Sequence, residues 1–306
     1  MSVTAGACAK CILCGEHFVV HGCPCIAFPV YGLETKVVLD KSDSDGIRVN
    51  VHGVSFSDLP KVVQSARETT RLLCEAMGRP DFGGLTVDVT GSMPVSQGFG
   101  SSASFSVALV RALLKYWHLA LDEADILSFA GMSEKCYHKS PSGVDHSTIA
   151  LEKLILFRDG QCIDTLRSGT DFRFVLASVG PREGTGSVIA RVSQWKNQNP
   201  EAFQSMCVES AAISQRAWQS LKEGNAQKLG ELLKQNQKLL AELGVSSPAL
   251  NECIAAAESA GALGAKLTGA GAGGGVVALV DDEHLDLVIQ SWKKLRLPFI
   301  YPIKLH

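Results

Sequence analysis

The stretch from position 94 to 104 reads Pro94-Val95-Ser96-Gln97-Gly98-Phe99-Gly100-Ser101-Ser102-Ala103-Ser104, and an apolar segment ending near Trp117 follows directly. Gly98 and Gly100 allow positive φ angles and leave space for successive N–H groups to face one anion. The first N–H groups of the following helix have no partner within the helix, so they also favour an anion. The stretch therefore predicts a phosphate-binding loop at a helix N-terminus.

Two other interpretations of this loop stay open on the residues alone. Gly98-x-Gly100-x-x-Ala103 fits the dinucleotide-binding fingerprint, but the nearest strand-like run, residues 85–89, ends well before the first glycine. A helix cap that binds no ligand is the other interpretation, because serine and glycine both favour helix N-termini.

Ser101 and Ser102 add hydroxyls to the loop. A hydroxyl at such a place can ligate a Mg²⁺ that bridges phosphates.

The length and charge of the chain limit the classes of function. Its 306 residues are 46% hydrophobic, and 29 Lys and Arg against 31 Asp and Glu give a net charge of −2. We expect two domains, 1–168 and 169–306, because single cores stop growing near ~250–300 residues. The charge balance does not indicate nucleic-acid or acidic-membrane partners. Without a membrane-span or secretion pattern in the sequence, we expect a soluble cytoplasmic protein that acts on small molecules.

Ten cysteines raise the question of disulfides or a metal cluster. Cys8, Cys11 and Cys14 are spaced as in a ferredoxin, but Phe18 stands where the fourth cysteine would be. The apolar residues between them predict a strand, on which a spacing of three turns neighbouring thiols to opposite faces. We therefore expect reduced thiols and no cluster.

Hydrophobic periodicity predicts a mixed α and β chain. Strands are expected as two runs within 26–40, at 46–51 and 85–89, and as three runs within 154–179. Helices are expected at 60–77, 101–117, from the N-cap Asp122 to about 138, and around 190–195, 202–221, 226–243 and 248–260. The helix at 101–117 is apolar on nearly every side, which predicts deep burial.

Several ionisable residues lie where these elements begin or end. Lys10 is the single charge in an apolar strand, and Gly15, Glu16 and His17 follow it. Such a lysine usually extends to solvent, but a neighbouring anionic ligand would hold it. Glu134 comes near a helix C-terminus, where an acid is either solvated or held by a cation. Asp145 follows a rigid Pro-Ser-Gly-Val turn at a helix start, where acids are also common caps.

A second glycine-rich segment runs from Lys266 to Gly275 and reads Lys-Leu-Thr-Gly-Ala-Gly-Ala-Gly-Gly-Gly. Gly269-x-Gly271-x-x-Gly274 fits the dinucleotide pattern, but a strand-like run follows it instead of a helix, so the context rejects that fingerprint. Glycines between two buried strands favour close approach of the backbone to a ligand.

Taken in order, these motifs resemble those of the galactokinase, homoserine kinase, mevalonate kinase and phosphomevalonate kinase (GHMP) superfamily. The resemblance covers nearly the whole chain, and the Gly15-Glu16-His17 cluster together with the turn before Asp145 is similar to the mevalonate kinase branch. It implies an α+β, two-domain GHMP-kinase fold. The N-terminal nucleotide-binding domain would contain a left-handed β-α-β crossover, and the helix-rich, ferredoxin-like C-terminal domain would complete the substrate site.

The resemblance also implies a reaction, the ATP-dependent phosphorylation of mevalonate at its C5 hydroxyl in isoprenoid biosynthesis, and a possible homodimer. It makes Asp145 the catalytic base with Lys10 beside it, and Ser102 and Glu134 the Mg²⁺ ligands. The implied nucleotide-binding residues are Pro94, Gly98, Phe99, Gly100, Ser101, Ser102 and Ala103. The implied mevalonate-binding residues are Lys10, Glu16, His17, Asp145, Thr185, Gly269 and Ala270.

Departures from the family pattern leave the substrate more open than the reaction. Ser187 stands where the family often has a basic residue, His21 replaces a frequent tyrosine, and His146 replaces an asparagine. A related kinase that acts on another hydroxy acid or on a sugar is the alternative, and a nucleotide-binding module without catalysis is the third hypothesis.

Overall fold

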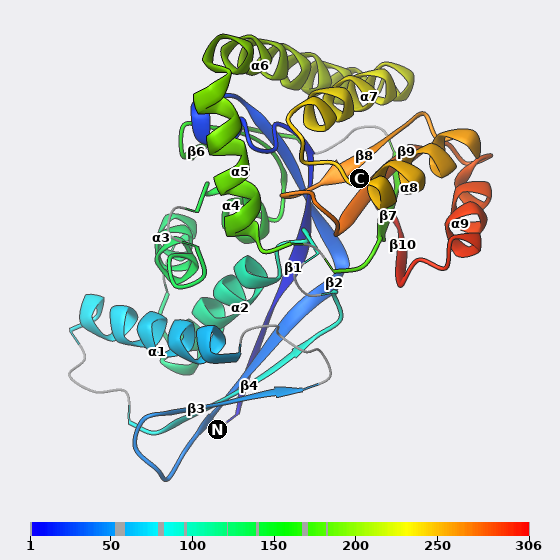
Figure 1. The fold of residues 1–306 in the computed structure, drawn as a ribbon. Coiled ribbons are helices and arrows are strands. Elements are labelled where there is room, and N and C mark those ends of the chain that lie inside the picture. Colours follow the sequence, from blue (N-terminus) through cyan, green and yellow to red (C-terminus); the bar gives the residue numbers. More distant parts are fainter. Residues whose placement is uncertain are drawn as a thin grey trace. The chain divides into compact units, whose positions relative to one another are not determined.

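The computed structural model describes residues 2–52, 59–78, 83–94, 97–120, 122–138, 141–166, 171–181 and 183–305. The chain forms two compact units, and their helices and strands are labelled in Figure 1. Unit 1 comprises Met1–Lys10, Pro29–Ser96 and Gly100–Glu152, and unit 2 comprises Cys11–Phe28, Gln97–Phe99 and Lys153–His306. The boundaries fall within strands β1 (Val3–Cys14) and β2 (Cys25–Lys41). The domain boundary expected at 168/169 lies outside the described residues.

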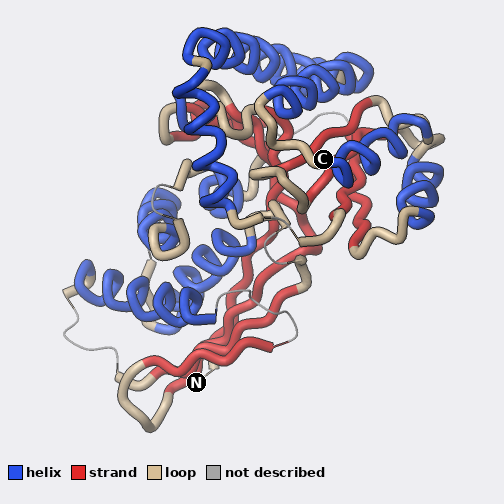
Figure 2. The backbone as a smooth tube through the Cα atoms, in the orientation of Figure 1, coloured by secondary structure: helices blue, strands red, loops and turns tan. Residues whose placement is uncertain are grey.

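Unit 1 contains a parallel and an antiparallel strand pair. Strand β4 (Leu85–Gly91) pairs antiparallel with residues 35–41 of β2 and parallel with β3 (Ile47–His52). Figure 2 shows these strands side by side near the N-terminus. Helix α1 (Leu59–Ala76) follows β3 in the chain, because parallel neighbours need a crossover connection.

Three further helices complete unit 1, and each begins where the local sequence favours it. They are α2 (Ser101–Tyr116), α3 (Glu123–Glu134) and α4 (Val144–Leu151). Asp122 accepts from the N–H of Asp125 and the reciprocal bond completes a capping box, which confirms Asp122 as an N-cap. Gly100 and Gly143 precede α2 and α4 with φ angles of 78° and 94°. Apolar residues of all four helices and of the strands share one core, so α2 is deeply buried, as predicted.

Unit 2 is built on a four-stranded antiparallel sheet. Its strand order is β10 (Phe299–Leu305), β7 (Phe172–Ser178), β9 (Gly275–Val280) and β8 (Gly264–Thr268). In the chain, helices separate β7 from β8 and β9 from β10, which is the ferredoxin-like arrangement. These helices are α5 (Thr185–Gln198), α6 (Pro200–Glu223), α7 (Ala226–Glu242), α8 (Pro248–Ser259) and α9 (Leu285–Lys294).

Unit 2 also contains a smaller antiparallel ladder. Residues 25–27 of β2 pair with β5 (Leu154–Arg158), which pairs with β6 (Gln161–Leu166). The short helix η1 (Val19–His21) lies between β1 and β2 in the chain.

Most predicted elements are confirmed, with three differences. The expectation of two strands within 26–40 is wrong, because β2 is one strand that passes through Gly32 at a φ of 83° and pairs with different neighbours at its two ends. Helix α3 ends at Glu134 instead of about residue 138. The elements η1, α9 and β10 have no counterpart among the predicted elements.

Candidate functional site

Lys10 and Asp145 form an ion pair in unit 1. The Lys10 Nζ lies 2.9 Å from Oδ1 of Asp145, and the lysine side chain is 2% exposed against 33% for the carboxylate. A buried ammonium requires an anionic partner, so Asp145 stabilises Lys10 while remaining open to solvent. A Cβ at Gly100 would lie 2.9 Å from Cγ of Lys10, which explains a glycine at this close approach.

The position of Asp145 follows from its helix. Gly143 adopts a left-handed conformation immediately before α4, and Asp145 is the second residue of that helix. The N-terminal end of a helix dipole favours a negative charge there. The prediction that Asp145 lies at a helix start is therefore confirmed.

Glu134 ends α3 as a buried carboxyl group. The hydroxyls of Ser102 and Ser106 donate to its two oxygens at 3.3 and 3.2 Å. Burial, and next the charge of Asp145, raise the pKa of Glu134 to about 8, against the lowering effect of the two serines and Lys10. A carboxyl group in this position is partly protonated near neutral pH, and a cation placed beside it would favour its ionised form.

The hydroxyl groups of three buried serines form a hydrogen-bonded chain that ends at the Glu134 carboxyl group. Ser133 donates to Ser106 at 2.9 Å and lies 2.8 Å from the hydroxyl of Ser65 on α1. These serines come from three helices, and nothing in the sequence connects them. The local sequence indicates a buried hydroxyl only where a polar residue stands inside an apolar helix, as at Ser106.

The glycine-rich loop has the backbone geometry that the sequence predicts. Gly98 and Gly100 have φ angles of 93° and 78°, and no side chain caps α2, which keeps its first N–H groups available. Ser101 and Ser102 lie half-buried in the first turn of α2, Ala103 is buried, and Phe99 is buried in unit 2. Pro94 is half-buried, and the two residues after it lie outside the described ranges.

In unit 2, an ion pair and a hydrogen bond join the turn after β1 to strand β8 and the glycine segment that follows it. Glu16 forms an ion pair with Lys266, and both side chains are almost completely buried. Thr268 accepts from the N–H of Ile12 and donates to its carbonyl, both at 3.1 Å. His17 donates from Nε2 to the Ala270 carbonyl at 2.9 Å. His17 therefore contacts the glycine segment at Ala270, and Glu16 contacts the start of the same segment at Lys266.

The two glycine segments also approach each other within unit 2. A Cβ at Gly98 would lie 2.7 Å from the Thr268 carbonyl oxygen, and one at Gly269 would lie 2.9 Å from Cα of Gly98. Any side chain at either position would separate the segments. This contact between two protein segments explains why glycine stands at both positions, whereas the close approach predicted from the sequence was to a ligand.

Thr185 is not joined to this cluster by hydrogen bonds of the described residues. It is half-buried at the first position of α5, and Ser187 two residues later is exposed and donates to the Gly184 carbonyl at 2.8 Å. The loop 181–187, in which the family pattern is broken, includes residue 182, which lies outside the described ranges.

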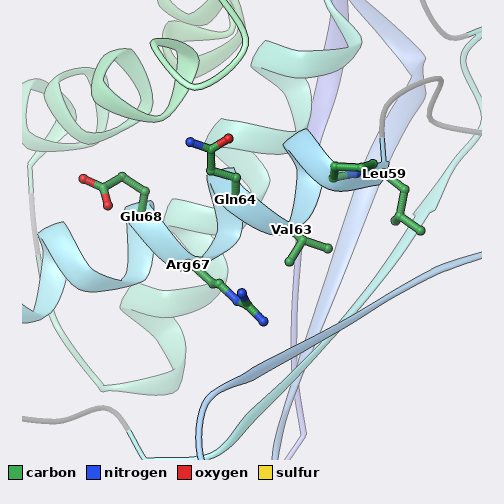
Figure 3. Close-up of a pocket in the computed structure, with 6 residues that line it drawn as sticks. Leu59, Val63, Gln64, Arg67 and Glu68 are labelled. Atoms are coloured by element: carbon green, nitrogen blue, oxygen red, sulfur yellow. The ribbon is translucent and has the colours of Figure 1, made fainter.

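A pocket of about 530 Å³ lies along α1 (Figure 3) and contains no residue predicted for the site. It is lined by Leu59, Pro60, Val63, Gln64, Arg67 and Glu68. In the described parts of the chain, no three His, Cys, Asp or Glu side chains are grouped to hold a metal, and no helix is long and apolar enough to cross a membrane. All ten cysteines carry free thiols.

Comparison with known proteins identifies the family. The model of the GHMP kinases N-terminal domain matches residues 62–153, and that of the GHMP kinases C-terminal domain matches residues 218–296. The curated mevalonate kinase of Pyrococcus abyssi is 32% identical over 93% of this chain and 90% of its own length. That of Pyrococcus furiosus is 31% identical, with coverage of 94% and 92%.

Solved structures agree with this result. The L. major mevalonate kinase in complex with R-mevalonate superposes with a TM-score of 0.87 at 28% identity, covering 99% of this chain and 95% of that one. The resemblance predicted from the ordered motifs is thus confirmed, and the chain belongs to the GHMP kinase family.

Proposed function

We propose that this chain transfers the γ-phosphoryl group of ATP to the C5 hydroxyl of mevalonate, giving 5-phosphomevalonate and ADP for isoprenoid biosynthesis. Similarity to mevalonate kinases over nearly the whole chain supports this assignment, and one of the similar structures holds R-mevalonate. The observation that carries the mechanism is the ion pair of buried Lys10 with the solvent-accessible Asp145.

In the proposed mechanism, Asp145 accepts the proton of the substrate hydroxyl. Its carboxylate reaches solvent at a helix N-terminus, where an incoming hydroxyl can donate to it. The ammonium group of Lys10 fixes the carboxylate on one side and offsets negative charge that develops on the transferred group. Positioning and charge stabilisation together account for most catalysis in phosphoryl transfer.

Mg²⁺ fits the donor set around Glu134. The Ser102 hydroxyl and the Glu134 carboxyl group lie 3.3 Å apart and provide the hard oxygen ligands that Mg²⁺ prefers. The raised pKa of Glu134 fits a carboxylate that a cation keeps ionised. One or two protein ligands are the usual number for Mg²⁺ that also binds substrate phosphates. When bound, the ion would neutralise charge on those phosphates.

The remaining assignments follow the resemblance and the local geometry. In unit 1, Gly100 to Ala103 would bind phosphate through the uncapped N-terminus of α2, and Pro94 lies just before the loop; in unit 2, Gly98 and Phe99 belong to the same loop. We assign mevalonate recognition to Lys10 and Asp145 of unit 1 and to a set of unit 2 residues: Glu16, His17, Thr185, Gly269 and Ala270. A homodimer, a cytoplasmic location and the division at 168/169 remain predictions.

The hydrogen bond of His17 restricts how this residue can bind a carboxylate. Its Nε2 already donates to the Ala270 carbonyl. Nδ1 can therefore donate to the carboxylate of mevalonate only in the imidazolium form, in which both ring nitrogens carry protons.

A coupled assay for ADP release, run with and without mevalonate, tests the proposed function. We expect turnover that requires both ATP and mevalonate. Turnover with a sugar or another hydroxy acid in place of mevalonate would support the related-kinase alternative. Nucleotide binding without turnover on any of these alcohols would contradict a kinase.

A further inference from the structure

A second pocket, of about 440 Å³, lies in unit 2 where residues of η1, β5, α5 and α6 meet. Its volume is within the range of small-molecule sites. None of the residues assigned to ATP, mevalonate or Mg²⁺ lines it. The lining residues that matter here are His21, Pro24, Arg158, Lys196 and Phe203.

The side chains of this pocket carry positive charge without an acidic lining residue among those described. Lys196 lies 5.5 Å from the centre of the Phe203 ring, and His21 packs edge-on against the same ring at 4.9 Å. Arg158 donates from Nε to the carbonyl of Gly22, another lining residue, at 3.0 Å, which restrains its guanidinium group. Its ion-pair partner, the neighbouring Asp159, does not line the pocket.

The charge of Lys196 also acts on His21. Burial, and then the charge of Lys196, lower the pKa of His21. In the described part of the chain, Lys196 has no carboxylate within ion-pair distance. Like charges gathered around one cavity raise the local potential, and an anion in the cavity would offset it.

We propose that this pocket binds a small organic phosphate. Arg158 and Lys196 would bind the phosphate oxygens, since guanidinium and ammonium groups both form charge-assisted hydrogen bonds to phosphate. His21 would add a donor when it is protonated. The carbon part of the ligand would pack against Phe203 and Pro24. This site is separate from the proposed catalytic residues, so the inference does not depend on the kinase assignment.

Phenyl phosphate is a suitable probe. Benzoate, which carries a carboxylate on the same phenyl ring, is the comparison ligand. Calorimetry would measure binding to the full chain in the presence of saturating ADP, which fills the proposed nucleotide site. NMR titration would follow the His21 ring, assigned by the loss of its signal in His21→Gln. We expect saturable binding of phenyl phosphate, a rise in the pKa of His21 on binding, and much weaker binding of benzoate.

Matched lysine variants make the test specific. Lys196→Gln should weaken binding at least about tenfold, as expected for the loss of a charge-assisted hydrogen bond, and Lys196→Arg should retain it. Lys222→Gln is the control, because Lys222 also lies over an aromatic ring, Trp218 at 5.6 Å, but is paired with Asp164 at 2.8 Å. An unperturbed His21 signal, equal weakening by Lys222→Gln, or benzoate binding as tight as phenyl phosphate would overturn the proposal.

Discussion

Asp145 can be tested with a change that keeps the size of the side chain. Asp145→Asn removes the basic oxygen, so kcat should fall by at least ~100-fold, the usual range for general base catalysis. Nucleotide binding should be retained, because the glycine loop and the N-terminus of α2 are untouched. Steady-state kinetics and calorimetry on the folded variant measure both quantities. Asp281→Asn, at a surface carboxylate paired with His284, is the control, and near-normal turnover in Asp145→Asn would refute the assignment.

Ser102 and Glu134 should act on Mg²⁺ as a unit. Ser102→Ala or Glu134→Gln alone should lower turnover and raise the Mg²⁺ concentration needed for half the maximal rate. The double variant should lose less than the two single losses combined, because groups that share one ion are coupled. Measuring MgADP binding by calorimetry gives a readout independent of turnover. Additive losses, or unchanged Mg²⁺ dependence in Glu134→Gln, would exclude a shared ion.

At the scale of elements, the contact between α3 and α4 sets the surroundings of Glu134 and Asp145. A Cβ at Gly131 on α3 would lie 3.1 Å from Nε2 of His146 on α4, and burial lowers the pKa of that histidine. Gly131 precedes Glu134 by three residues, and His146 follows Asp145 directly. A change at this contact should therefore be transmitted to both carboxyl groups.

Gly131→Ala should lower both stability and kcat, because the added methyl group displaces His146. In the His146→Ser background, the same substitution should instead stabilise the protein by up to about 1 kcal/mol, the helix-propensity gain of alanine over glycine. Thermal unfolding and steady-state kinetics of the wild type, the two single variants and the double variant measure this change of sign. Gly186→Ala is the control, since its Cβ would have no neighbour within 4 Å. Equal effects of Gly131→Ala in both backgrounds would rule out the proposed contact.

The C-terminal end of α3 should make stability depend on pH. Burial raises the pKa of Glu134 from its ordinary value of 4.5 to about 8 in the folded chain, so the folded state holds the proton more tightly. The contribution of protonated Glu134 to the free energy of unfolding is fully present below about pH 4.5 and is lost as the pH rises towards 8. It amounts to several kcal/mol at most. Denaturant unfolding in EDTA at pH 5.5 and 8 should show a smaller pH difference for Glu134→Gln than for the wild type. Identical differences would show that Glu134 does not titrate in this range.

Across the whole molecule, the free thiols should differ strongly in reactivity. Burial is the main cause that raises the pKa of Cys8, Cys14, Cys23 and Cys253 to about 12. Thiolates are therefore rare at these positions at pH 8, and the native protein should react slowly there with a disulfide reagent. Titration after denaturation should approach ten thiols per chain, whereas a clearly lower number would indicate a disulfide or a modification.

The features that the sequence predicts depend mainly on local signals. The cap at Asp122, the start of α4 before Asp145 and the glycines before α2 each follow from a few adjacent residues, and all are found in the structure. The features that sequence reasoning missed depend on contacts between distant segments. Ser65 and Ser133, for example, are 68 residues apart and meet only when α1 packs against α3.

The long strand β2 is another feature that depends on contacts between distant segments. Its middle contains Gly32, which suggests a break between two strands, but pairing with β4 and β5 at its two ends keeps the strand continuous. Partners from elsewhere in the chain therefore overrode the local preference. The roles of the site residues came from the resemblance, because spacing alone does not identify a substrate.

The buried pair of Glu16 and Lys266 has a consequence for biosynthesis, because the two residues are 250 positions apart. At about 5–20 residues per second, a ribosome needs roughly 10 to 50 seconds to reach the lysine codon after the glutamate has been added. The strand β10, which completes the sheet of unit 2, is made later still. Ile12, Glu16 and His17 of the nascent chain must therefore wait for their partners at 266–270 until most of the chain has been made, and we expect a chaperone to bind this segment in that interval.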